Sequence, residues 1–88
     1  MQGRARIAWN LRRIRSEKGV SQENLAVDAA VDRSSISGIE QQRVSVSIDL
    51  LDRLATALAV DVSEFLVVPS PEQREPQALA PGRKPMRR

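Results

Sequence analysis

The amino-acid composition changes after Val68, and this change limits the part of the chain that can form a hydrophobic core. All five prolines of the 88-residue sequence fall in residues 69–88, together with several charged residues and few apolar ones. Such a segment cannot bury enough apolar surface to offset the entropy of ordering it. We therefore expect one small domain over residues 1–68 and a flexible, proline-rich, basic tail over residues 69–88.

Two residue types that support catalysis and metal binding are missing, because the sequence contains no cysteine and no histidine. Without cysteine, neither disulfides nor thiolate metal sites can reinforce a core of this size. Without histidine, the chain lacks the commonest general base and the commonest metal ligand. No paired-carboxylate site is indicated either. We predict a protein that is not an enzyme and that uses no metal or cofactor.

The sequence also gives no sign of a membrane segment. No apolar run approaches the roughly 20 residues needed to span a bilayer. The basic start of the chain is not followed by the hydrophobic stretch of a signal peptide. We expect a cytoplasmic protein with no membrane partner.

Charge is distributed unevenly along the chain. Residues 1–18 contain six arginine or lysine residues and one glutamate, whereas residues 44–68 contain one arginine and four acidic residues. A domain with a basic end and an acidic end can present one side to a polyanion. Ordinary solvated helix faces account for the same charges equally well, so charge alone does not select a nucleic-acid partner.

Apolar periodicity predicts an all-α fold of four or five helices with no strand. In residues 4–18, Ile7, Leu11 and Ile14 fall at i, i+4 and i+7, which is one stripe of a helix. Gly19 then ends that helix as a left-handed C-cap. The remaining helices are expected from Ser21 to Ala29, over residues 33–41 after Asp32, from Ser47 to Leu58, and as a short fifth helix opened by Asp61 and Glu64 at capping-box spacing.

Two short helices joined by a tight turn, the second small and polar on one face, form a helix-turn-helix arrangement. The segment IAWNLRRIRSEKGVSQ (7–22), followed by ENLAVDAAVDRSSISGIE, resembles the Cro/C1-type (XRE) family of repressors. The resemblance continues through VSIDLLDRLATALAVDVSEFL and covers roughly residues 7–67. Within the family, VDRSSISGIE is most similar to the controller proteins of restriction-modification systems. The resemblance implies a five-helix lambda-repressor-like DNA-binding domain.

It also implies that residues 33–41 are a recognition helix lying in the major groove of duplex DNA, where each base pair shows a distinct hydrogen-bonding pattern. Arg33 in the first turn can fork onto O6 and N7 of a guanine, although pairing with Asp32 or a phosphate is the simpler role for a surface arginine. The base-contact candidates are Arg33, Ser34, Ser37 and Gly38. Related repressors often carry a long side chain at the position of Gly38, so part of the specificity is expected to come from DNA shape.

Phosphate contacts are expected around this helix. Gln22 lies at the N-terminus of the second predicted helix, where free amides and the helix dipole favour an anion, although a solvated glutamine fits the same position. The phosphate-contact candidates are Gln22, Ser35, Gln41, Gln42 and Arg43. The resemblance further implies that Arg15 and Glu40 pair with each other, tying the first helix to the end of the recognition helix.

Three residues depart from a simple pattern. The family usually has glycine at the positions of Ala30 and Gln42, and a left-handed conformation costs a non-glycine residue roughly 1–2 kcal/mol. Either the turns shift or the fold tolerates the strain. Trp9 falls on the helix face opposite the apolar stripe, among arginines. It either stacks on an arginine side chain or anchors a partner protein or the tail.

A single recognition helix touches few base pairs, so we expect a homodimer that reads two half-sites about 34 Å apart on a pseudo-palindromic operator. The candidate interface is Val62, Phe65, Leu66 and Val67, with Val68 beside them, although some of these side chains must belong to the core and Phe65 could serve either purpose. The predicted function is sequence-specific regulation of transcription. Two alternatives stay open at this point: a DNA-binding antitoxin that holds a small toxin protein, and a module for protein–protein contact on the same fold.

Overall fold

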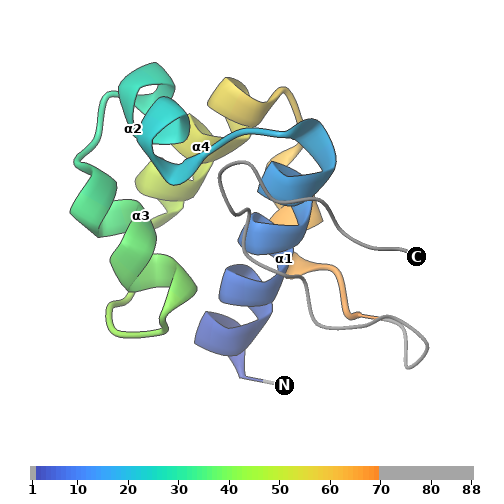
Figure 1. Ribbon diagram of the computed structural model, residues 1–88. Helices are drawn as coiled ribbons and strands as arrows, with labels where there is room; N and C mark the ends of the chain where they lie inside the picture. The colour runs from blue at the N-terminus through green and yellow to red at the C-terminus, as the bar shows by residue number, and fades with distance from the viewer. Residues whose placement is uncertain (1, 70–88) are drawn as a thin grey trace, which may run out of the picture.

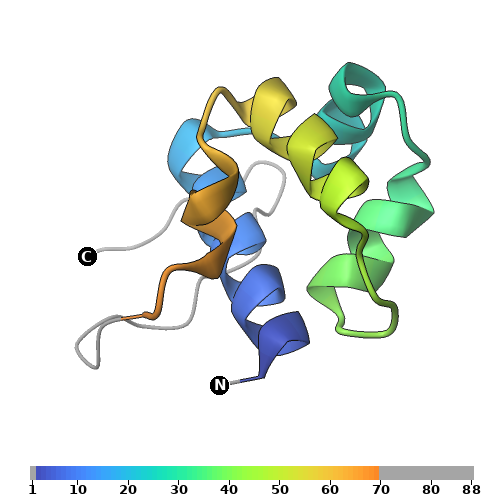
Figure 2. The same ribbon diagram turned by 180° about the vertical axis from the view of Figure 1, so that it is seen from behind.

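The computed structural model describes residues 2–69, and these residues form an all-helical fold without strands. Its α-helices are α1 (Gly3–Lys18), α2 (Gln22–Ala29), α3 (Arg33–Glu40) and α4 (Ile48–Leu58), and a 3-10 helix, η1 (Val62–Leu66), follows them (Figures 1 and 2). None of these helices is both long enough and apolar enough to cross a membrane. The tail expected over residues 69–88 lies, apart from Pro69, outside the described residues.

The helix boundaries follow from local capping chemistry. Gly19 ends α1 in the left-handed conformation, with φ of 68°. The hydroxyls of Ser21 and Ser47 accept hydrogen bonds from the amides of Asn24 and Leu50, each at 3.0 Å, and so begin α2 and α4. Asp32 precedes α3 without a side-chain capping bond. The intrinsically weak helix α3 therefore depends on packing more than on its cap.

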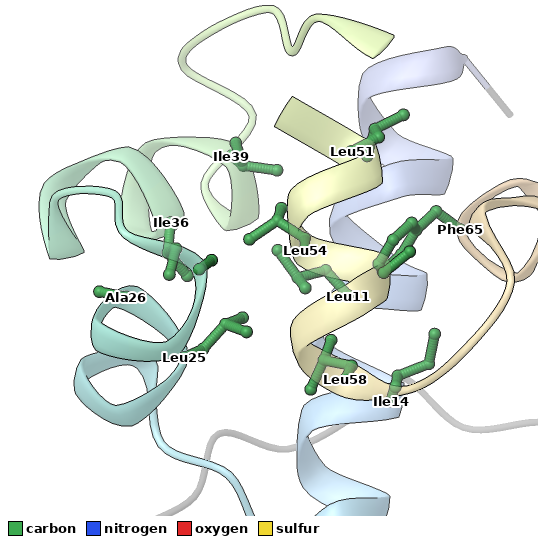
Figure 3. Close-up of a cluster of buried hydrophobic side chains, with 12 residues drawn as sticks. Leu11, Ile14, Leu25, Ala26, Ile36, Ile39, Leu51, Leu54, Leu58 and Phe65 are labelled. Carbon is green, nitrogen blue, oxygen red and sulfur yellow. The ribbon is translucent and has the colours of Figure 1, made fainter. Parts of the chain in front are cut away.

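One core joins the four α-helices and η1. The stripe on α1 supplies Leu11 and Ile14, which meet Leu25 of α2 and the inner leucines of α4 (Figure 3). Ile36 and Ile39 anchor α3 to the same cluster, and both are buried. These two contacts hold α3 against the body of the domain along one face only, leaving its other face outside.

The short fifth helix expected near Phe65 is a 3-10 helix rather than an α-helix. Asp61 caps it by accepting a hydrogen bond from the amide of Ser63 at 2.9 Å, so the reciprocal capping box with Glu64 does not form. Hydrogen bonds from the side chain and the backbone of Ser63 hold the pKa of Asp61 below its ordinary value. This carboxylate therefore supports the cap above its unfolded-state pKa and loses that contribution as the pH falls through its folded-state value.

Among residues 2–69, three non-glycine residues adopt the left-handed conformation: Ala30, Gln42 and Ala59, with φ of 59°, 61° and 59°. The turns after α2 and α3 thus keep the geometry that glycine usually provides, and the fold tolerates the strain. Ala59, which ends α4, adds a third such position that sequence reasoning did not identify. Packing of the flanking helices has to offset roughly 1–2 kcal/mol at each of them.

Replacing Ala30 or Ala59 by glycine should raise the free energy of unfolding by about 0.5–1 kcal/mol each, because the strain removed exceeds the added chain entropy of glycine. Chemical denaturation monitored by circular dichroism measures this change. Ala57→Gly, inside α4, is the matched control and should lower the free energy of unfolding by about 1 kcal/mol. If all three glycine substitutions lowered the free energy of unfolding, the claim that Ala30 and Ala59 are strained would be contradicted.

Candidate nucleic-acid interface

Helices α2 and α3, joined by a tight turn, form the helix-turn-helix unit at one side of the domain (Figure 1). Buried Ala26 and Ala29 of α2 and the two isoleucines of α3 belong to the same core cluster. On the opposite side of α3, Arg33 and Ser34 are exposed and Ser37 is half-buried. The residues expected to face DNA bases therefore lie on the outer face of α3, with the exception of Gly38.

Gly38 is buried, which corrects the expectation that it faces a base. The loop after α3 folds back over it, so that a Cβ atom at Gly38 would lie 3.4 Å from Cγ2 of Val44 and 3.8 Å from a terminal nitrogen of Arg43. The amide of Arg43 also donates a hydrogen bond to the Gly38 carbonyl at 2.9 Å. The distances of 3.4 and 3.8 Å are ordinary van der Waals contacts, so the loop residues lie directly over Gly38 and cover the surface that would face a base.

The ion pair between Arg15 and Glu40 lies inside the protein. Nε and Nη2 of Arg15 donate to the two carboxylate oxygens of Glu40 at 2.7 and 2.9 Å, and each side chain is only 4% exposed. The third nitrogen, Nη1, donates to the carbonyl of Val20 at 2.9 Å. This bidentate geometry fixes the C-terminal end of α3 relative to α1 and to the loop that precedes α2.

Gln22 joins the same network. Its Nε2 donates to Oε1 of Glu40 at 3.0 Å, so the side-chain amide is held at the ion pair. The half-buried amide sits at the start of α2, whose free backbone N–H groups point outward from the helix end. A phosphate contact at Gln22 stays a prediction. The donors for it would be the free backbone N–H groups at the start of α2 and the second hydrogen of the Gln22 side-chain amide.

Removing the Glu40 carboxylate by Glu40→Ala should lower the free energy of unfolding by about 3–5 kcal/mol, because the buried charge of Arg15 then has no anionic partner. Thermal and chemical denaturation measure the loss. Glu23→Ala, which removes an exposed carboxylate of α2, is the matched control and should change stability by less than about 0.5 kcal/mol. Equal, small effects of both substitutions would contradict a structural role for the pair.

The loop after α3 carries the remaining phosphate candidates. Gln41, Gln42 and Arg43 are all exposed, and Ser35 is half-buried at the start of α3. This loop lies at the same end of the domain as the N-terminus of α1 (Figures 1 and 2), where Nη2 of Arg4 donates to the hydroxyl of Ser45 at 2.8 Å. Two arginines, Arg4 and Arg43, thus lie at the loop that follows α3.

The candidate dimer residues divide into two groups. Phe65 is completely buried in the core, which corrects its assignment to an interface, and Val62 packs partly against the same core. Leu66, Val67 and Val68 are 44%, 43% and 65% exposed. The exposed apolar surface at this end of the described chain is therefore Leu66–Val68.

Asn10 is a structural residue that sequence reasoning missed. It is fully buried, and its Nδ2 donates to the carbonyls of Phe65 and Val67, both at 2.9 Å. Arg13 donates to its Oδ1 at 3.1 Å, and the guanidinium of Arg13 lies over the Trp9 ring, 5.8 Å from the centroid. The available signal was a polar residue three positions after Ile7 and four before Ile14, inside the apolar stripe.

An open groove of about 470 Å³ runs between α2 and α4, lined by Asp28, Ala29, Asp52, Arg53, Thr56 and Ala57. Within residues 2–69, no group of three or more acidic side chains gathers in a way that could hold a metal ion. The groove mixes carboxylates with an arginine and small side chains. It shows no chemistry beyond a solvated surface.

Comparison with known proteins places this chain among helix-turn-helix proteins. Residues 6–66 match the helix-turn-helix domain family. The chain is 36% identical over 66 residues to a Neisseria meningitidis protein described as a hypothetical transcription factor, and it spans 62% of that protein's length. The crystal structure of the Neisseria factor superposes with a TM-score of 0.74 at 35% identity, over 77% of this chain and 78% of that chain.

Restriction-modification controller proteins are also similar in structure. The controller C.AhdI from Aeromonas hydrophila has a TM-score of 0.68 at 37% identity, covering 70% of this chain and 94% of its own. The controller C.Esp1396I, solved bound to a 19-base-pair DNA duplex, has a TM-score of 0.69 at 32% identity, covering 75% of this chain and 88% of its own.

Proposed function

The chain belongs to the helix-turn-helix family of DNA-binding transcriptional regulators, and on that premise we propose that it binds a specific duplex sequence through the outer face of α3. One observation carries the proposal. The inner face of α3 is anchored by Ile36 and Ile39, and its C-terminal end is anchored by Glu40, while Arg33 and Ser34 point away from the core. The helix is thus rigidly held with its polar side free for a major groove.

Arg33 is the residue proposed to read a base. It is exposed in the first turn of α3, the part of a recognition helix that contacts base edges in this docking mode. Its fork of N–H donors matches the two acceptors of guanine. Ser34 and Ser37 reach less far, so they act only where the backbone comes close to the groove. DNA shape supplies the remaining discrimination.

Selection of bound sequences from random duplexes, followed by the same selection with Arg33→Ala, tests this assignment. We expect the variant to lose preference at one symmetric pair of positions, with a cost of about 1–3 kcal/mol for each guanine contact. Arg53→Ala, an exposed arginine on α4, is the matched control and should leave the preferences unchanged. Unaltered base preferences in the Arg33 variant would overturn its role as a base reader.

We also propose that the protein acts as a homodimer on a pseudo-palindromic operator, with half-sites about one helical turn apart. Exposed Leu66 and Val67 support this, because Asn10 of α1 holds the backbone that carries them and their side chains lie outside the core. Apolar side chains held outward in this way favour an isologous contact with a second copy. In the proposed dimer, the domain has a lambda-repressor-like fold in which η1 takes the place of the fifth helix.

Replacing Leu66 and Val67 together by aspartate should shift the protein toward the monomer and lower operator affinity at least tenfold, because two charges would have to be buried in the contact. Sedimentation equilibrium measures the mass, and circular dichroism checks that the fold is retained. Val27→Asp changes a valine that is 74% exposed on α2 and serves as the control. An unchanged mass in the double variant would place the interface elsewhere.

A further inference from the structure

A hydrogen-bonded chain of side chains runs from α3 into the loop that follows it. Nε2 of Gln41 donates to the hydroxyl of Ser37 at 3.1 Å, and Nε of Arg43 donates to Oε1 of Gln41 at 2.9 Å. The side-chain amide of Gln41 therefore donates one of its two N–H groups to α3 and accepts from Arg43 with its oxygen. Ser37 and Gln41 are i, i+4 neighbours, so the chain continues the row that begins at Arg33.

The backbone beneath Arg43 is held at several points. Its amide donates to the Gly38 carbonyl at 2.9 Å, and Gln42 turns the chain there with φ of 61°. Val44 covers Gly38, and Ser45 accepts the hydrogen bond from Arg4 at 2.8 Å. These contacts fix the position of the Arg43 backbone, and the bond to Gln41 is what restricts the exposed Arg43 side chain itself.

We propose that Gln41 is a positioning residue that holds the Arg43 guanidinium against a phosphate of bound duplex DNA. This rests on the proposed function. The bond to Gln41 uses only Nε, which leaves the terminal nitrogens of the guanidinium for an anion. Arg33 and Gln41 are eight residue steps apart, about 12 Å along the helix axis, and this distance is comparable to the width of the major groove. Arg33 reaches base edges while Arg43 meets the backbone at the other end of the helix.

Pre-ordering explains why the chain carries a glutamine here. A free arginine has to lose rotamer freedom when it binds a phosphate, whereas an arginine held by Gln41 has lost part of that freedom before binding. Ser37 then acts as the support for Gln41. In this arrangement Gln41 does not read a base, which leaves direct base contact to Arg33, Ser34 and Ser37.

The test is a double-mutant cycle on the full-length protein, with the affinity for its selected duplex measured across salt concentrations. Arg43→Ala should reduce the slope of log affinity against log salt by about 0.9 for each protomer. Gln41→Ala should weaken binding about threefold in the wild-type background and leave it unchanged in the Arg43→Ala background, since residues that act as a unit are not additive. Base preferences should be the same in all four proteins.

Gln42→Ala is the matched control, since it removes an exposed glutamine of the same loop, and its effect should add to that of Arg43→Ala. In the DNA-free protein, the Nε–H resonance of Arg43 should exchange with solvent faster in Gln41→Ala than in wild type. Additive effects of Gln41 and Arg43, a changed base preference in Gln41→Ala, or an unchanged exchange rate would overturn the positioning role. Failure of wild type to select any duplex would instead overturn the proposed function itself.

Discussion

The orientation of α3 depends on the buried ion pair of Arg15 and Glu40. Three serines and a glycine give this helix little intrinsic stability, and its N-terminus has no side-chain cap. Two isoleucines hold it to the core, but apolar contacts have no direction and allow a helix to roll or slide. The bidentate hydrogen bonds from Arg15 to Glu40, together with the bonds that Val20 and Gln22 make to this pair, are directional and fix the orientation of α3. A pair of this kind contributes geometry more than net stability, because its desolvation offsets much of the Coulomb attraction.

On another face of α1, polar side chains hold the C-terminal end of η1 and the residue that follows it. Arg13 donates to the carbonyl of Glu64, Asn10 to those of Phe65 and Val67, and Arg6 to that of Leu66. Four successive carbonyls thus find donors on one helix. The surplus of positive charge in residues 1–18 therefore overstates what is available to a polyanion, since Arg15 is buried and Arg13 is engaged in this contact.

Sequence reasoning succeeded where local chemistry decides the outcome. Gly19 ends α1, and Ser21 and Ser47 begin α2 and α4. Each of these caps acts through hydrogen bonds to residues a few positions away. It failed at Gly38 and Phe65 because both assignments treated a position as if only its own helix surrounded it. A loop covers Gly38, and Phe65 is buried where η1 packs against α1 and α4. Asn10 was missed for the same reason, since its partners lie 55 and 57 residues away.

The sequence alone determined the helices, the family and the polar character of α3, because periodicity, capping residues and motif are all properties of neighbouring positions. The tertiary structure decided which side chains are available. It turned Gln22 toward Glu40, enclosed Phe65, left Leu66–Val68 outside and linked Arg43 to Ser37 through Gln41. Burial and hydrogen-bond partners depend on the packing of elements distant in sequence, and no local pattern contains that information.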